Sequence, residues 1–560
     1  MTAVPSPLAN NKEGNHQMAT AGVVPHRLNR SAGSWKWPTG TLLTVVSIGG
    51  LALWSGPPPM RAPWDVFILL DGGYRIMEGQ VPSTDFYSPI GPLVYEIVSL
   101  GMRMETQPSL RAVTIGALIF LAIATALAWV VARARLPAPF AAGFTVLIAI
   151  LVVADRPLGY TPSITSYAML YNRWSWVLYA IVLVLVLVRP AGPVANHRPA
   201  VDGAILGLLS ALLFYCKINF FVGAAGAIVV GLALGTLRRR ARLGLWAVGT
   251  FLGVVIVMWA AFGVRVASYL GDVAEAGRAQ GAQRMSSFVS ELVHNLPFTL
   301  LVAVVFGGVI FVARRRGEST RKLRQVTIAA AYILGSSVFV ASLNTLERAD
   351  LPALAVIPLL LVAYRPVWPA WLRRPLLFSV AVLLLPTAGF VGVKDVASLA
   401  EAAYARSKGP DLATSQQIAS VHLRDFDVPA DSTWQTAYRP ANDVPEMINN
   451  GIAMLDKHAG AHDPVAAVAL TDPFAFATDR QPAPGALWWD VGISFSAASH
   501  PDPDVAFGST RWVMIPRVNP GEGCCTETVT AMLDIYGPYL QQHFTEVDRS
   551  TDWILLGRRA

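Results

Sequence analysis

The chain has 560 residues, of which 54% are hydrophobic and 14% are charged, and its mean hydropathy is +0.47. This composition excludes an ordinary set of soluble domains and predicts a polytopic membrane protein. The formal net charge of +8 does not indicate nucleic-acid binding, because the basic residues stand in short clusters between apolar segments, where they orient helices in a bilayer.

Residues 1–39 are polar, and we expect them to form a disordered tail ahead of a retained first anchor. After them, eleven apolar segments are long enough, or nearly so, to cross about 30 Å of hydrocarbon. They lie at 40–56, 109–131, 138–154, 174–188, 202–216, 218–237, 243–263, 296–313, 326–343, 351–364 and 375–392. Several are short, and 202–237 reads either as two crossings broken at Lys217 or as one long helix. The sequence therefore predicts about eleven transmembrane helices.

Basic residues gather in alternate connections of this arrangement. The N-terminal tail and the connections on its side hold 21 Lys and Arg and three acids, whereas the opposite connections hold 11 and 12. Because Lys and Arg favour the cytoplasmic side, we expect the N-terminus inside and the first loop, 57–108, outside. An odd number of crossings then places everything after residue 393 outside as well.

The part of the chain from 393 to 560 differs in composition from the transmembrane part, 40–392. It has 12 Lys and Arg against 21 Asp and Glu, and it contains a helical pattern near 446–458 and strand-like runs such as "PVAAVALTD", "RWVMIPRV" and "WILLGR". We expect an extracytoplasmic α/β domain, with a helix over 528–544 that breaks near Gly537 and Pro538. Cys524 and Cys525 are either a strained disulfide or two free thiols.

The first outer loop carries four carboxylates in one short stretch, "WDVFILLDGGYRIMEGQVPSTDFYSPIGPL", residues 64–93. Its first half, 63–79, predicts an amphipathic helix with its apolar face on the membrane surface. A solvated loop would explain one or two of the acids. The Gly turn, the two Pro-stiffened corners and the aromatics around Asp85, Tyr87 among them, indicate a rigid arrangement that a mere linker does not need.

These features, an acid shortly after the first crossing, then "EGQVP", then "DFYSPIGPL", resemble the GT-C superfamily of polytopic glycosyltransferases. The superfamily includes protein O-mannosyltransferases, aminoarabinose transferases and many bacterial cell-envelope transferases. The resemblance implies a catalytic loop Asp, a sugar donor carried on polyprenyl phosphate and an extracytoplasmic C-terminal domain. It assigns the catalytic role to Asp65, 14 residues before Gly79, with Asp71 as the alternative. Many relatives have Asp-Glu where this chain has Asp65-Val66.

A carboxylate suits this chemistry, because the attacking hydroxyl must lose its proton as it displaces the phosphate, and a single base implies inversion at the anomeric carbon. Six residues on a helix separate Asp65 and Asp71 by about 240°, so only one is expected to face the substrate. We expect no tightly held metal or other cofactor, although a divalent ion is an alternative. Asp85 and Tyr87 are expected to contact substrate.

The departing phosphate needs positive charge nearby. Lys217 with its neighbour Asn219, Arg173, and Arg348 with Asp350 stand at outward ends of crossings and are predicted to bind substrate. The alternative for Arg173 and Lys217 is that they reach the lipid headgroups. Two further patterns are less specific. "TDPF" at 471–474 reads as turn chemistry, and Trp488 and Trp489 form either a sugar-stacking platform or part of the domain packing.

The sequence thus predicts a glycosyltransferase of the bacterial inner membrane that moves a hexosyl or pentosyl group from a polyprenyl-phosphate donor. The acceptor would be a hydroxyl of a cell-envelope glycan or lipid, and no nucleic acid would be involved. A transporter or flippase of lipid-linked sugars and a non-catalytic envelope assembly protein are the alternatives. The identities of the sugar and of the acceptor do not follow from the sequence.

Overall fold

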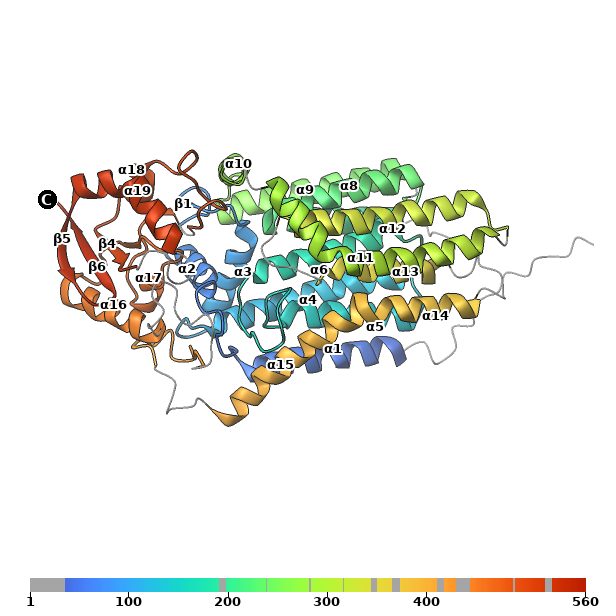
Figure 1. Cartoon of the computed structure of the whole chain (residues 1–560), viewed down its shortest axis with the longest axis horizontal. Helices are drawn as coiled ribbons and strands as arrows, with labels where there is room; N and C mark the ends of the chain where they lie inside the picture. Colours follow the sequence, from blue (N-terminus) through green and yellow to red (C-terminus); the bar gives the residue numbers. More distant parts are fainter. Residues whose placement is uncertain are drawn as a thin grey trace, which may run out of the picture.

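The structure is a computed structural model that describes residues 36–190, 198–237, 239–281, 284–315, 317–343, 350–364, 373–409, 417–429, 444–486, 489–518 and 526–560. Long helices lie side by side along the long axis of the molecule (Figure 1). A mixed unit of helices and strands, formed by the C-terminal part of the chain, covers one end of this bundle, and α2 and α3 lie between the two.

Among the described residues, eight helical segments are long and apolar enough to cross a membrane and three more are shorter, which makes eleven. Seven of the long ones are α1 (Lys36–Ser55), α4 (Arg111–Arg133), α6 (Leu170–Leu187), α7 (Arg198–Cys216), α9 (Arg240–Phe262), α11 (Arg284–Arg315) and α12 (Thr320–Ala341). The last combines α14 (Arg373–Leu384), a π-helical turn and α15 (Phe390–Lys408). The shorter ones are α5 (Ala138–Val153), α8 (Ile218–Leu234) and Pro352–Tyr364, which includes α13 (Val356–Tyr364). Each overlaps a predicted crossing, so the predicted polytopic fold is confirmed.

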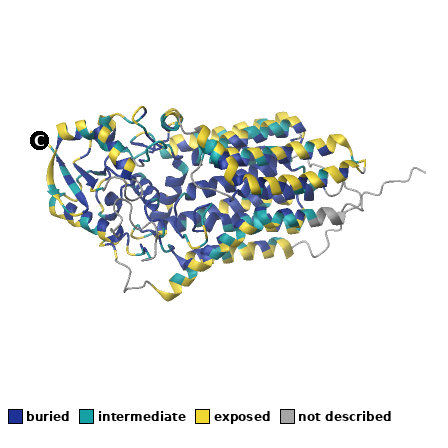
Figure 2. Cartoon of the chain, in the orientation of Figure 1, coloured by how far each residue is buried: buried dark blue, intermediate teal, exposed yellow. Residues whose placement is uncertain are grey.

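The helices of the bundle differ in how much protein surrounds them. The apolar stretch of α6 is 100% buried, whereas that of α9 is only 6% buried. Figure 2 shows this contrast between a buried centre and exposed outer helices. A helix that is apolar all round suits both places, because one is surrounded by other helices and the other by lipid.

The helical stretch that contains α7 and α8 is interrupted at Lys217. α7 ends at Cys216 and α8 begins at Ile218, and between them Lys217 has an extended backbone, with φ −162° and ψ 115°. The prediction of two crossings rather than one long helix is therefore correct. The break places a lysine at the end of the bundle that carries the C-terminal part of the chain.

The first loop contains α2 (Val66–Met77), β1 (Phe86–Tyr87) and α3 (Pro92–Arg103). The apolar face of α2 does not lie on the membrane surface, contrary to the prediction. Phe67 is completely buried, and its ring stacks on that of Phe426 at 5.4 Å. Two glycines let α3 approach from the other side, since a Cβ on Gly72 would come within 2.3 Å of the ring of Tyr95. Protein therefore covers α2 where the sequence predicted lipid.

The C-terminal part folds as an α/β unit, as predicted. Its elements are α16 (Val444–His458), β2 (Val465–Ala467), α17 (Phe474–Ala477), β3 (Gly485–Ala486), α18 (Pro503–Phe507), β4 (Trp512–Pro516), α19 (Thr526–His543), β5 (Phe544–Arg549) and β6 (Trp553–Arg558). The four-stranded sheet has the order β2-β4-β6-β5, with β2 and β4 parallel and the other pairs antiparallel. The predicted break near Gly537 and Pro538 is wrong, because α19 runs through Pro538. Strand β5 was not predicted.

The first loop and α10 (Val266–Ala279) both contact the C-terminal unit. Strand β1 pairs in parallel with β3, with Phe86 opposite Gly485 and Tyr87 opposite Ala486. Helix α10, which follows α9, makes the second contact, since Gln280 at its end donates a hydrogen bond to the carbonyl of Ile493 at 3.1 Å. The loop and the C-terminal unit therefore form one continuous structure.

Candidate active site

Asp65 lies at the N-terminus of α2, where the first loop meets the C-terminal unit. Its side chain is half-buried and makes no hydrogen bond or ion pair with any residue that the structure describes. Burial raises the pKa of Asp65 from 3.8 to about 6. A carboxylate without partners and with a raised pKa is a candidate for proton transfer.

Asp490 is the neighbour of Asp65 that the sequence analysis missed. Burial, with a contribution from the negative charge of Asp65, raises the pKa of Asp490 to about 7. Its carboxylate likewise has no hydrogen bond or ion pair within the described part of the chain. The charge of Asp65 thus favours the neutral form of Asp490.

Backbone contacts explain why these two residues meet. Thr471 donates a hydrogen bond to the carbonyl of Trp64, the residue before Asp65, at 3.4 Å. The next residue back, Leu470, accepts one at 3.1 Å from the amide of Trp489, the residue before Asp490. The segment at 470–471 thus contacts the residue before each of the two aspartates, Trp64 and Trp489. Trp489 itself is buried against Tyr536, so it packs the domain, and Trp488 lies outside the described residues.

The turn that carries Asp490 is firmly held. The carbonyl of Asp490 accepts hydrogen bonds from the amides of Ile493 and Ser494, and its own amide donates to Ser494 Oγ at 2.8 Å. Tyr87, predicted to contact substrate, instead donates its hydroxyl proton to the carbonyl of Ser494 at 2.5 Å. Tyr87 therefore helps to hold the turn that carries Asp490, and its contact with substrate stays a prediction.

Asp71 occupies a different environment from Asp65. It is buried, and one of its oxygens forms an ion pair with Nε of Arg75 at 2.8 Å. Arg75 also donates to the carbonyl of Ala483, in the C-terminal unit, at 2.6 Å. The expectation that Asp65 and Asp71 do not share a pocket agrees with this placement, which gives Asp71 a partner and leaves Asp65 without one.

Asp85 has a local structural contact. One oxygen accepts a hydrogen bond from the amide of Val81 at 2.7 Å, which closes the turn between α2 and β1. The backbone carbonyl of Asp85 accepts from Gly485 at 2.9 Å and so extends the pairing of β1 with β3. Asp85 thus shapes the rigid stretch that the sequence analysis identified.

Lys217 stands beside the start of α6. Its Nζ donates a hydrogen bond to the side chain of Asn172 and lies 5.0 Å from the ring centre of Tyr171. Asn219, half-buried, follows in the first turn of α8. The first loop touches this place, because a Cβ on Gly91 would come within 2.0 Å of the carbonyl oxygen of Tyr215. Lys217 is therefore a cation at the same end of the bundle as the loop.

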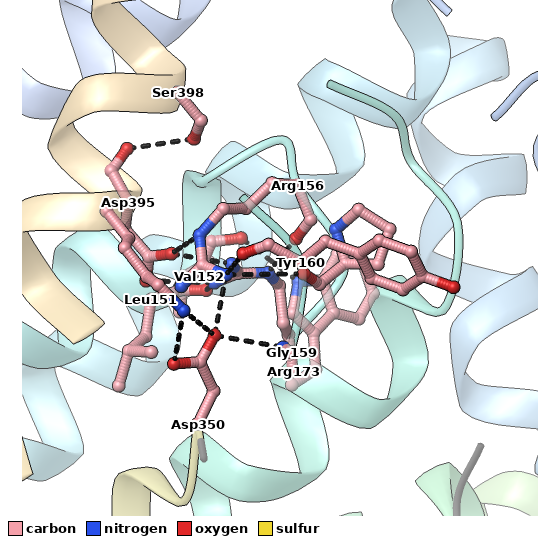
Figure 3. Close-up of polar contacts among 12 residues, drawn as sticks. Leu151, Val152, Arg156, Gly159, Tyr160, Arg173, Asp350, Asp395 and Ser398 are labelled. Carbon is pink, nitrogen blue, oxygen red and sulfur yellow. Dashed lines mark hydrogen bonds and ion pairs between the residues drawn. The ribbon is translucent and has the colours of Figure 1, made fainter. Parts of the chain in front are cut away.

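Arg173 and Asp350 belong to a buried ion cluster, shown in Figure 3. Arg173 contacts both oxygens of Asp395, on α15, at 2.8 and 3.1 Å. Arg156 bridges the two halves of the cluster, with Asp350 at 2.6 Å and Asp395 at 2.8 Å. Arg173 is buried, so it does not reach toward headgroups as the alternative proposed. The cluster joins the connection between α5 and α6 to the last crossing.

Lys394 completes this cluster at its more open side, where its Nζ lies 3.1 Å from Asp350. Burial raises the pKa of Asp350, but the positive charges of Arg156 and Lys394 outweigh this effect and hold the pKa below its ordinary value. Arg348, predicted to act with Asp350, lies outside the described residues. Arg173 and Asp350 thus have buried ion-pair partners of their own, and their role in substrate binding stays a prediction.

The residues that the sequence analysis missed have long-range partners. Asp395 and Arg156 pair across the bundle, and Asp490 and Asp472 belong to a domain in which acids are common. Asp472 does form the expected turn, since its Oδ1 accepts from the amide of Phe474 at 2.9 Å. No local pattern distinguishes these acids from solvated ones.

The described residues include no group of three or more His, Cys, Asp or Glu side chains placed to hold a metal ion. Asp65 and Asp490 are the two carboxylates of the site that could contribute oxygen ligands to a bound cation. Their arrangement is equally suited to accept a proton from a hydroxyl placed beside them.

No model of a known protein family matches the chain, and no curated protein sequence matches it. Solved structures are similar. ArnT from Cupriavidus metallidurans bound to undecaprenyl phosphate aligns at TM-score 0.44 and 12% identity, over 95% of this chain and 99% of that one. The apo form of the same ArnT aligns at TM-score 0.45 and 13% identity, over 94% and 98%.

An oligosaccharyltransferase from Archaeoglobus fulgidus, solved with zinc and sulfate, aligns at TM-score 0.27 and 11% identity, over 84% of this chain and 68% of that one. At these scores and identities the matches concern the course of the chain and assign no residue a role.

Proposed function

We propose that the protein is a membrane glycosyltransferase in which Asp65 is the general base. The observation that carries this proposal is the state of the Asp65 carboxylate, which has no partner among the described residues and a pKa raised to about 6. Of the other loop acids, Asp71 is paired with Arg75 and Asp85 closes a turn. Of Asp65, Asp71 and Asp85, Asp65 is thus the one that is free to accept a proton near neutral pH.

The proposed reaction is a single displacement. The hydroxyl oxygen of the acceptor attacks the anomeric carbon and gives its proton to Asp65, while the bond from that carbon to the phosphate oxygen breaks. The configuration inverts, and the phosphate leaves on its lipid as an anion. Lys217, at the same end of the bundle, supplies the positive charge that stabilises this anion.

A lipid-phosphate donor suits a site at the end of a bundle of apolar helices. The lipid tail can lie among helices while the sugar reaches the loop, and the exposed helices face the bilayer (Figure 2). We propose a polyprenyl phosphate as the carrier and a cell-envelope glycan or lipid as the acceptor. The proposed location is the bacterial inner membrane, with Asp65 and the C-terminal domain on the outer side, as the distribution of basic residues predicts.

Purified protein in liposomes, supplied with a set of polyprenyl-phosphate sugars and envelope acceptors, tests the proposal. Wild type should transfer a sugar, Asp65→Asn should not, and Glu78→Gln should behave as wild type because Glu78 is an exposed acid of the same loop. Movement of lipid-linked sugars across the liposome bilayer without any transfer would instead identify a transporter. Equal transfer by wild type and Asp65→Asn would remove Asp65 from the mechanism.

A further inference from the structure

A second pair of carboxylates lies at the junction between the first loop and the C-terminal domain, and the proposed reaction does not use it. Asp71, on α2, and Asp472, just before α17, are both buried. Helices α2 and α17 pack against each other at this junction (Figure 1). One guanidinium, that of Arg75, is paired with Asp71 there. The junction thus places two acids beside one base, away from water.

The hydrogen bonds around these acids are incomplete. Arg75 Nε engages one oxygen of Asp71, and the amide of Phe474 engages Oδ1 of Asp472. The remaining oxygens, Oδ1 of Asp71 and Oδ2 of Asp472, are buried and have no partner among the described residues. Leaving two charged oxygens unsatisfied in a buried place costs several kcal/mol, so one of the two groups is expected to be neutral.

The charges around Asp71 and Asp472 also favour a neutral form for one of the two acids. Burial raises the pKa of Asp71, which Arg75 opposes, and burial together with the charge of Asp71 raises the pKa of Asp472. The other titratable groups that face Asp71 are Tyr74 on α2 and Tyr95 on α3. Burial raises the pKa of both tyrosines, so they stay neutral and supply no further charge.

We propose that Asp71 and Asp472 share one proton, and that this proton fastens the C-terminal domain to α2 and thereby positions Asp65. The proton held by the pair neutralises one of the two buried carboxylates, and the remaining single negative charge is balanced by Arg75. Asp65 stands at the N-terminus of the same helix, so Asp71, Arg75 and Asp472 are positioning residues that touch no substrate. The link to catalysis rests on the proposed function, whereas the link to docking does not.

The same contacts show what loss of the proton would disturb. Arg75 donates to the carbonyl of Ala483 at 2.6 Å, and Gln80 donates to that of Pro482 at 2.6 Å. Both carbonyls belong to the segment that leads into β3, which pairs with β1. A second negative charge beside Arg75 would draw the guanidinium toward Asp472 and away from this segment. Docking should therefore weaken as the pH rises, because the docked state holds a proton that the separated state releases.

Hydrogen exchange at the amides of α2 tests the docking without any need for activity. In wild type, protection corrected for the intrinsic exchange rate should fall by on the order of tenfold or more between about pH 6 and about pH 9. In Asp472→Asn, whose amide group donates a hydrogen bond as the protonated acid would, protection should stay nearly constant. Because this variant keeps Asp65 and Asp490, their titration cancels in the comparison.

Asp534→Asn is the control, since it removes the same charge from an exposed position on α19 of the same domain. It should show the pH dependence of wild type. If Asp472→Asn does not fold, Asp71→Asn serves instead, because Asp472 alone can then pair with Arg75 and no shared proton is needed. An unchanged pH dependence in the folded neutral variant would overturn the proposal.

Transfer assays add the link to Asp65. If the glycosyltransferase proposal holds, kcat of Asp472→Asn should persist at about pH 9, where kcat of wild type falls, while KM for the donor stays the same in both. A protein that transfers no sugar at all but shows the expected exchange behaviour would contradict the proposed function and leave the shared proton standing. If exchange in wild type does not change with pH while transfer is normal, the shared proton is contradicted and the proposed function stands.

Discussion

Burial raises the pKa of Asp490, in the C-terminal domain, and the negative charge of Asp65, in the first loop, adds to the rise. Neither carboxylate has a hydrogen bond or ion pair within the described part of the chain. The residues before them, Trp64 and Trp489, are both hydrogen-bonded to the segment at 470–471. The candidate site is therefore composite, with one carboxylate on the loop and the other on the domain. Five predictions follow from this arrangement and from the contacts around it.

Asp65→Asn should abolish sugar transfer and at the same time stabilise the protein. Loss of a general base costs about 10²- to 10⁴-fold in kcat. The folded state raises the pKa of Asp65 to about 6, so its ionised form destabilises the fold above that pH. Removing the charge should contribute about 1–2 kcal/mol at neutral pH for this half-buried group, measured as a higher Tm in detergent. A variant that is inactive and less stable would indicate a structural role instead.

The rate of transfer should rise as the pH passes about 6, because the base must be deprotonated and the pKa of Asp65 is raised to about 6. A fall is expected only at higher pH, where Asp71 and Asp472 lose their proton. Asp490→Asn should keep this acid limb in place, since the pKa of Asp490 is higher, about 7, and its charge develops after that of Asp65. A profile of kcat against pH for both proteins checks this. An acid limb near the ordinary pKa of 3.8 would contradict the assignment.

Lys217→Met should raise KM for the lipid-phosphate donor by about tenfold or more, because a cation at the phosphate is lost. Lys217→Arg should recover part of the affinity, since it keeps the charge but differs in shape. Binding of the carrier lipid without sugar, measured by calorimetry, separates phosphate recognition from chemistry. Equal affinity in wild type and Lys217→Met would place the phosphate elsewhere.

Asp395→Asn should destabilise the protein by about 3–5 kcal/mol, because it leaves the buried guanidinium groups of Arg156 and Arg173 with too little negative charge. KM for the donor should not change in the fraction that remains folded. Arg173→Met combined with Asp395→Leu removes both partners and should be less harmful than Asp395→Asn alone. A selective rise in KM for Arg173→Met would restore the predicted role of Arg173 in substrate binding.

Gly91→Ala should lower both Tm and activity, because its Cβ would lie 2.0 Å from the carbonyl oxygen of Tyr215 and would push the loop from the end of α7. Displacing backbone in this way costs about 1–3 kcal/mol. Gly50→Ala on α1, where the new Cβ meets nothing within 4 Å, is the control and should be neutral. A wild-type Tm for Gly91→Ala would show that the loop can move freely.

The sequence predicts the elements of this fold much better than their partners. Crossing helices are recognisable because each needs a long apolar run, and the break at Lys217 is recognisable because a charge interrupts one. The apolar face of α2 was assigned to the membrane, since a local pattern cannot tell whether lipid or protein will cover it. In the structure protein covers this face, since Phe67 of α2 stacks on Phe426.

The candidate site shows the same division. Asp65 was predicted from its position after the first crossing, and its separation from Asp71 follows from helical geometry. Asp490 and Asp472 could not be predicted, because each acts through a neighbour some 400 residues away in the chain. Arg173 was assigned to substrate from its position at a helix end, where its partner Asp395 could not be foreseen.

The pairing of Phe86 with Gly485 and of Tyr87 with Ala486 has a practical consequence. A chimera that exchanges only the C-terminal domain with that of another transferase would leave half of a two-stranded sheet behind. Such exchanges should succeed only when the stretch from Gln80 to Gly91 travels with the domain, so the unit of recombination is discontinuous in the gene.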